Sequence, residues 1–146
     1  MNEFTGNERE ASMLEIIDLL HQYAWSLDGG DGAGLKDVFN ESATASVRVA
    51  GKAASAEPWQ GRETIASALT RKRDANPLWS SHQLTTPLFV ALEHDRATVK
   101  TYLSLFSCER GETPEIAATG EYRAQVSRVS GSWKIDQLEL TLDSEV

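Results

Sequence analysis

Cysteine and histidine are scarce in this sequence of 146 residues, which contains one cysteine and three histidines. Cys108 stands alone, so the chain can form neither an intramolecular disulfide nor a cysteine-based zinc cluster. The three histidines are scattered and have no clustered carboxylates beside them, which argues against a metal site. We therefore expect no metal and no other cofactor.

Long apolar runs are also missing. No stretch approaches the roughly 20 apolar residues that span a bilayer, and the first residues lack the basic and apolar regions of a signal peptide. Acidic residues outnumber basic ones by 22 to 14, a net charge of −8, so the overall field repels nucleic acid and anionic lipid. We expect a soluble, cytoplasmic protein with no nucleic-acid or membrane partner.

One basic run, Arg71-Lys72-Arg73, departs from this acidic character. It lies at the end of a predicted helix, where positive side chains interact favourably with the negative end of the helix dipole. This interpretation is favoured over a phosphate site.

The hydrophobic period changes once along the chain. It is helical in the first half, where Gly29-Gly30 and then Asn76-Pro77 end helices and Asp31 is typical of an N-cap. After Pro77 the period is two, as in strands. The predicted elements are helices at 11–27, from Asp31 through Phe39, and from Gly61 to Asn76, and strands at 43–50, 82–93, 96–108, 116–129 and 132–142.

This order predicts an α+β fold, with helices packed on one face of a mainly antiparallel sheet. Long strands joined by hairpins tend to curl, and a curled sheet closed by helices encloses a pocket, a common place for a small-molecule site. We expect a single domain over residues 11–142, preceded by a flexible N-terminus at 1–10.

Several segments, in order, carry a resemblance to a known family. The stretch from Ile17 to Asp31 resembles the opening of SnoaL-like proteins, which belong to the nuclear transport factor 2-like superfamily. The resemblance extends over residues 12–140. The further matching segments are 61–65, 81–84, 97–102, 120–122 and 131–135.

The resemblance implies a cone-shaped fold, in which a strongly curved sheet wraps around the N-terminal helices and encloses a deep apolar pocket. Members of the family include scytalone dehydratase, bile-acid dehydratase, a dehydrochlorinase and polyketide cyclases. It also includes non-catalytic proteins and the small subunits of ring-hydroxylating dioxygenases, so the fold alone gives no activity. Family sheets often pack face to face, which implies a homodimer or a higher homo-oligomer.

The resemblance also implies three catalytic residues. Asp28 and His82 match an Asp at the end of the first helix that is paired with a His on a later strand, and Tyr23 matches a Tyr one turn before that Asp. Such an Asp holds one imidazole nitrogen and leaves the other free to take a proton. Scytalone dehydratase uses a second pocket histidine, which neither His21 nor His94 supplies here. The set therefore indicates proton transfer without specifying a substrate.

Other residues are candidates for the pocket wall, although each is more typical of an ordinary core. Three of them alternate along one strand and share one of its faces, but the sequence leaves open which face looks inward. The candidates are Trp25, Phe39, Trp59, Trp79, Tyr102, Ser104, Phe106 and Tyr122.

We expect a cofactor-independent lyase or isomerase that acts on a small apolar carbonyl compound. A polyketide, terpenoid or steroid-like metabolite, altered in a tailoring step of natural product biosynthesis, fits this expectation best. Dehydration, isomerisation and cyclisation start with the same proton abstraction and are not separable from the sequence. Two alternatives stay open: a non-catalytic small-molecule-binding module, and a small structural subunit of a ring-hydroxylating dioxygenase.

Overall fold

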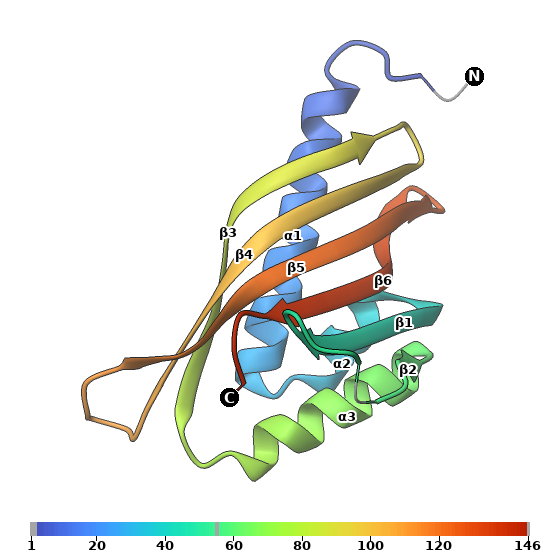
Figure 1. The fold of residues 1–146 in the computed structure, drawn as a ribbon. Coiled ribbons are helices and arrows are strands. Elements are labelled where there is room, and N and C mark those ends of the chain that lie inside the picture. Colours follow the sequence, from blue (N-terminus) through green and yellow to red (C-terminus); the bar gives the residue numbers. More distant parts are fainter. Residues whose placement is uncertain (1–2, 55, 146) are drawn as a thin grey trace.

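The computed structural model describes residues 3–54 and 56–145, which form helices on one side of a curved sheet (Figure 1). The predicted α+β fold is confirmed, and most element boundaries lie within a few residues of the prediction. The elements are α1 (Glu8–Gly29), α2 (Gly32–Val38), β1 (Phe39–Val49), β2 (Trp59–Gln60), α3 (Arg62–Ala75), β3 (Trp79–Leu92), β4 (Arg96–Cys108), β5 (Glu115–Val129) and β6 (Ser132–Leu142).

Helix α1 begins at Glu8, three residues before its predicted start at residue 11. Glu8 and Glu10 in its first turn favour the positive end of the helix dipole. At the other end Gly30 adopts a left-handed conformation, with φ of 68°, and its N–H donates to the Leu27 carbonyl oxygen at 3.2 Å. This cap fixes the last turn of α1, which carries Asp28.

The short helix α2 begins as predicted. The Asp31 side chain is its N-cap and accepts a hydrogen bond from the Gly34 N–H at 3.0 Å. The prediction that Phe39 belongs to this helix is wrong, because Phe39 is extended and opens β1. Its strand conformation comes from pairing with Ile135 of β6, a partner almost 100 residues away in the sequence.

The described residues form one six-stranded sheet in the order β2-β1-β6-β5-β4-β3. Strands β3 to β6 pair antiparallel with their sequence neighbours, while β1 pairs parallel with β6. Helix α1 lies across one face of the long strands, and α3 lies beside β1 and β2 (Figure 1). Because β3 is an edge strand that contacts α1, its side chains come close to the end of that helix.

Irregular positions bend the sheet around the helices. Strand β3 loses register between Thr85 and Leu88, where Thr86 has a positive φ of 56° and Pro87 lacks an N–H to donate. On β5, Gly120 lies so close to β6 that an added Cβ would collide with the Thr141 carbonyl oxygen. These features let an antiparallel sheet curve enough to enclose a space.

The core lies between α1 and the concave face of the sheet. Alternate residues of β5 are buried, from Ala118 to Val126, and they face apolar side chains of α1 at helical spacing. The largest fully buried side chains are Phe39, Ile16, Leu35, Ile65 and Ile135. Within the described residues, no helix is both long and apolar enough to cross a membrane.

Candidate active site

Asp28 and His82 are in direct contact. The carboxylate Oδ1 of Asp28 lies 2.6 Å from Nδ1 of His82, and its Oδ2 accepts the His82 backbone N–H at 2.9 Å. The two side chains are 20% and 18% exposed, respectively. Because a carboxylate oxygen accepts, the neutral imidazole carries its proton on Nδ1 and leaves Nε2 free to accept another.

The ends of two helices and one strand hold this pair. Asp28 lies in the last turn of α1, and His82 lies near the start of β3, which contacts that helix. From the last turn of α3, Arg73 donates from Nε to the Asp28 carbonyl oxygen at 2.8 Å. That hydrogen bond satisfies one of the free carbonyls at the end of α1. The backbone of Asp28 and that of His82 are therefore both fixed before any ligand binds.

Behind the pair lies a cavity that is partly open to solvent and has a volume of about 470 Å³, a size typical of small-molecule sites. His82 lines both this cavity and an outer groove between α1 and β3, whereas Asp28 lines only the groove. The imidazole therefore stands between the carboxylate and the cavity. Most of the remaining lining is aliphatic, with leucines at 27, 69, 78, 103, 105, 138, 140 and 142.

Two tyrosines add a polar group to this apolar lining. The hydroxyls of Tyr23 on α1 and Tyr122 on β5 lie 3.1 Å apart, both side chains line the cavity, and both residues are 3% exposed. Burial raises the pKa of Tyr23 to about 12; the hydrogen bond from Tyr122 opposes this shift and the charge of Asp28 adds to it. The pKa of Tyr122 is raised well above its usual value, chiefly by burial and then by Tyr23.

Both hydroxyls therefore stay protonated at neutral pH. The pair has two hydroxyl protons, and one of them is used in the bond between the tyrosines. One proton remains for donation to a ligand or water in the cavity. The sequence predicted Tyr23 as a catalytic residue and Tyr122 as a candidate for the pocket wall. It missed the hydrogen bond between them, since the two residues are 99 positions apart.

The other candidates for the pocket wall divide into those that line the cavity and those that do not. Trp59 lines it, as Tyr122 does. Trp25 is 81% exposed on the outer side of α1, about half a helical turn away from Tyr23 in angle. Trp79 is 37% exposed and, like Trp25, lines the outer groove beside Asp28. Phe39 is fully buried and packs edge-on against Tyr23, outside the cavity lining.

The three candidates on β4 point the other way from the cavity. The inward face of this strand carries Leu103, Leu105 and Ser107, which line the cavity. Because side chains alternate across a strand, Tyr102, Ser104 and Phe106 lie on the outer face, and Tyr102 is 58% exposed. The prediction that these three residues form the pocket wall is corrected, because they lie on the outer face of β4. The sequence had left open which face of this strand looks inward.

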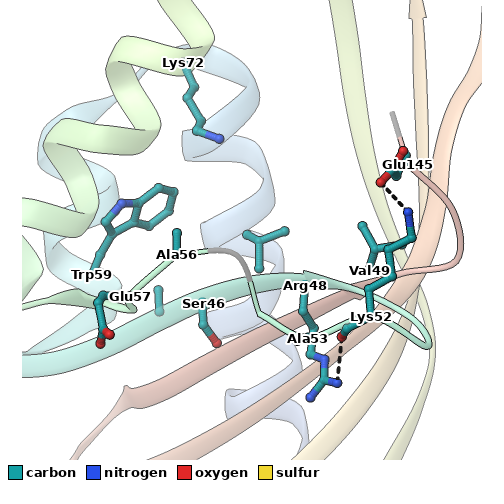
Figure 2. A pocket seen from close by; sticks show the side chains of 12 residues that line it. Ser46, Arg48, Val49, Lys52, Ala53, Ala56, Glu57, Trp59, Lys72 and Glu145 are labelled. Atoms are coloured by element: carbon teal, nitrogen blue, oxygen red, sulfur yellow. Dashed lines mark hydrogen bonds and ion pairs between the residues drawn. The ribbon is translucent and has the colours of Figure 1, made fainter.

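The sequence also missed two basic residues of the cavity wall, Lys72 and Arg73. A signal was present: Leu69, Lys72, Arg73 and Asn76 follow the spacing of one helix face, and all four line the cavity. An outer groove of about 310 Å³ adjoins the cavity and shares Trp59 and Lys72 with it (Figure 2). Within residues 3–54 and 56–145, no cluster of three His, Cys, Asp or Glu side chains could hold a metal ion.

Comparison with known proteins places the chain in a family. The family model of the SnoaL-like domain matches residues 8–139. The chain belongs to the SnoaL-like family. The resemblance predicted from the sequence is thereby confirmed, whereas no curated protein sequence matches this SnoaL-like chain significantly.

Solved structures share the fold of this SnoaL-like domain. ActVI-ORFA from Streptomyces coelicolor has a TM-score of 0.79 at 18% identity, with 91% of this chain and 98% of that chain covered. A candidate scytalone dehydratase from Novosphingobium aromaticivorans has a TM-score of 0.78 at 21% identity, with 96% and 92% covered. The beta subunit of a candidate aromatic-ring-hydroxylating dioxygenase from the same species has a TM-score of 0.80 at 15% identity, with 94% and 92% covered.

Proposed function

We propose that this SnoaL-like domain is a cofactor-independent lyase or isomerase acting on a small apolar carbonyl compound. The observation that carries the proposal is the Asp28–His82 contact of 2.6 Å at the wall of a mostly apolar cavity. A carboxylate behind an imidazole fixes the tautomer and stabilises the imidazolium that forms when the ring takes a proton. The SnoaL-like family and the candidate scytalone dehydratase among the neighbours support the same class of chemistry.

The reaction begins at Nε2 of His82, which removes a proton α to the carbonyl of the bound compound. The electrons of that C–H bond form an enolate, and the free hydroxyl proton of the Tyr23–Tyr122 pair hydrogen-bonds the enolate oxygen. In an elimination the enolate collapses, the C=C bond forms and the C–O bond breaks. The His82 imidazolium then protonates the leaving hydroxide, which gives water and restores the neutral ring.

Isomerisation and cyclisation use the same first step. In an isomerisation, the imidazolium returns its proton to a different carbon of the same compound. In a cyclisation, the carbanion attacks a second carbonyl of the ligand, and the proton goes to the new alkoxide. The cavity aids all three by orienting the compound against Nε2 and by excluding water.

Deuterium exchange tests this shared first step without knowledge of the natural substrate. Beta-tetralone, a bicyclic apolar ketone with acidic α-protons, is incubated with the protein in deuterium oxide and followed by NMR. We expect the wild-type protein to accelerate exchange, and His82→Gln to lower the rate about a hundred- to ten-thousand-fold. His94→Gln is the matched control, since His94 lies in the β3–β4 turn, paired with Glu8 at 3.4 Å and away from the cavity.

Exchange at the wild-type rate in His82→Gln would refute the proposed base. Failure of the wild-type protein to exceed the buffer rate, together with tight binding of the ketone, would favour the binding-module alternative. The absence of both exchange and binding would favour the other alternative, a structural subunit of a dioxygenase; one neighbour is the beta subunit of a candidate dioxygenase.

A further inference from the structure

The charge of the cavity wall differs from that of the whole molecule. The chain carries a net charge of −8. Among the described residues, however, no Asp or Glu lines the cavity, while Lys72 and Arg73 do. A mostly apolar cavity wall with cations and no carboxylate favours a negative ligand locally, although the rest of the surface repels it.

The helix dipole explains why Lys72 and Arg73 lie near the end of α3, but it does not explain why both side chains point to the cavity. A dipole favours bases in the last turn whichever way they point. Lys72 and Arg73 point to the cavity together with Leu69, whereas the neighbouring Arg71 lines a shallow surface groove on the other side of the helix. The same helix therefore offers two basic side chains at the cavity and one basic side chain of similar charge away from it.

Lys72 is the less constrained of the two cations. Arg73 already donates to the Asp28 carbonyl oxygen. The Lys72 ammonium forms no ion pair with any residue that the structure describes, and its Nζ lies 5.6 Å from the centre of the Trp59 ring. Figure 2 shows Lys72 and Trp59 on adjacent sides of the space where the outer groove meets the cavity.

The acidic groups of that groove do not neutralise Lys72. Glu145 pairs with Lys52 at 2.5 Å. Glu57 lines the groove, and in Figure 2 its carboxylate points away from the Lys72 ammonium. The place where the outer groove meets the cavity is the mouth of the cavity. The mouth therefore keeps the uncompensated positive charge of Lys72 next to the indole face of Trp59.

We propose that the ligand of this cavity is an amphiphilic anion, whose carboxylate or sulfonate-like group binds at the mouth between Lys72 and Trp59. Its apolar body then extends inward along the leucines towards His82 and the Tyr23–Tyr122 pair. The reverse orientation would bury an anion among aliphatic side chains, which is costly, while the mouth leaves the charge partly hydrated. An amphiphilic anion is a narrower substrate class than a small apolar carbonyl compound. The proposal rests on the proposed function only because it takes the cavity as the substrate site.

A matched pair of fluorescent probes tests the proposal. Anilinonaphthalene sulfonate (ANS) and the uncharged N-phenylnaphthylamine (NPN) share one aromatic body and differ in the sulfonate. We expect Lys72→Met to weaken ANS binding about threefold to fivefold, the upper part of the range of an exposed ion pair, and to leave NPN binding unchanged. Lys72→Arg should keep ANS binding within about twofold of the wild type, and raised salt should weaken ANS alone.

Arg71→Met is the control, because it removes the same charge from the other side of the same helix. An equal effect of Arg71→Met and Lys72→Met on ANS would overturn the proposal, since it would reflect the general field. So would an unchanged ANS affinity in Lys72→Met, an equal loss of both probes, or no binding of either probe to the wild type. A wild type that binds ANS through Lys72 but gives no deuterium exchange would overturn the catalytic proposal alone. Exchange that depends on His82, together with ANS binding that does not depend on Lys72, would overturn this proposal alone.

Discussion

Replacing Asp28 by asparagine keeps the shape of the side chain but removes the charge on which the proposed base depends. In the native protein both carboxylate oxygens accept hydrogen bonds from His82, one from the ring Nδ1–H and one from the backbone N–H. An amide has one acceptor oxygen and one donor NH₂, so it cannot accept both. If its oxygen faces the ring, its NH₂ meets the His82 backbone N–H. If it is flipped, the imidazole proton must move to Nε2.

Either arrangement loses the charge assistance of both hydrogen bonds, and the first also leaves the His82 backbone N–H without an acceptor. A hydrogen bond to a charged group is worth roughly 1.5–3 kcal/mol. Because Asp28 and His82 are 20% and 18% exposed, water screens part of this energy. We expect Asp28→Asn to lower the free energy of unfolding by about 2 kcal/mol, and the unfolding temperature by about 4–8 °C for a chain of this size.

Two measurements check this prediction. Thermal unfolding compares the wild type with Asp28→Asn and with Asp18→Asn, an exposed carboxylate on the same helix whose replacement should have no effect. Long-range nitrogen–proton NMR of the neutral His82 ring reports which nitrogen carries the proton. We expect Nδ1–H in the wild type and a population of Nε2–H in Asp28→Asn. A wild-type ring protonated on Nε2, or a variant with unchanged stability and tautomer, would refute the reasoning.

Two further predictions concern buried groups elsewhere. Because the pKa of Tyr23 is raised from 10.0 to about 12, the folded state favours the neutral hydroxyl. The stability that this preference contributes is intact below pH 10 and is lost as the pH rises to 12. Urea unfolding should therefore show the free energy of unfolding fall by about 2–3 kcal/mol over this range. The loss should shrink in Tyr23→Phe but not in the exposed Tyr102→Phe, and equal slopes in all three proteins would contradict it. Gly120→Ala should destabilise the fold by about 1–3 kcal/mol, because the added Cβ meets a backbone oxygen that cannot move aside. Gly29→Ala should not destabilise it, because a Cβ at Gly29 meets open space. Equal unfolding midpoints for the two variants would rule out the steric explanation.

The elements of this fold are readable in the sequence because they depend on local patterns. The helical period of α1, the Gly29-Gly30 stop and the Asp31 N-cap all act within a few residues, and the structure has each of them. The same holds for the alternating strands after Pro77. Phe39 departed from its prediction because a parallel strand pairing with Ile135 outweighed a continuing helical pattern.

The candidate site could be predicted only in part. The resemblance pointed to Asp28 and His82, and the structure places them in contact although they are 54 residues apart. The walls of the cavity were harder, because a strand has two faces and its pattern does not say which one looks inward. On β4 the inward face is that of Leu103, so Tyr102 lies outside.

The sequence by itself determined the element types, their order and the family, because hydrophobic period, capping residues and family segments are local features. Only the tertiary structure decided which chemistry-bearing side chains share a space. Packing of α1 against the sheet brings the hydroxyls of Tyr23 and Tyr122 together. The position of α3 beside the sheet directs Lys72 to the cavity mouth, while Arg71 lines a surface groove on the other side of the helix. Such neighbours are set by the curvature of the sheet and by pairings between strands far apart in the chain, which no local pattern encodes.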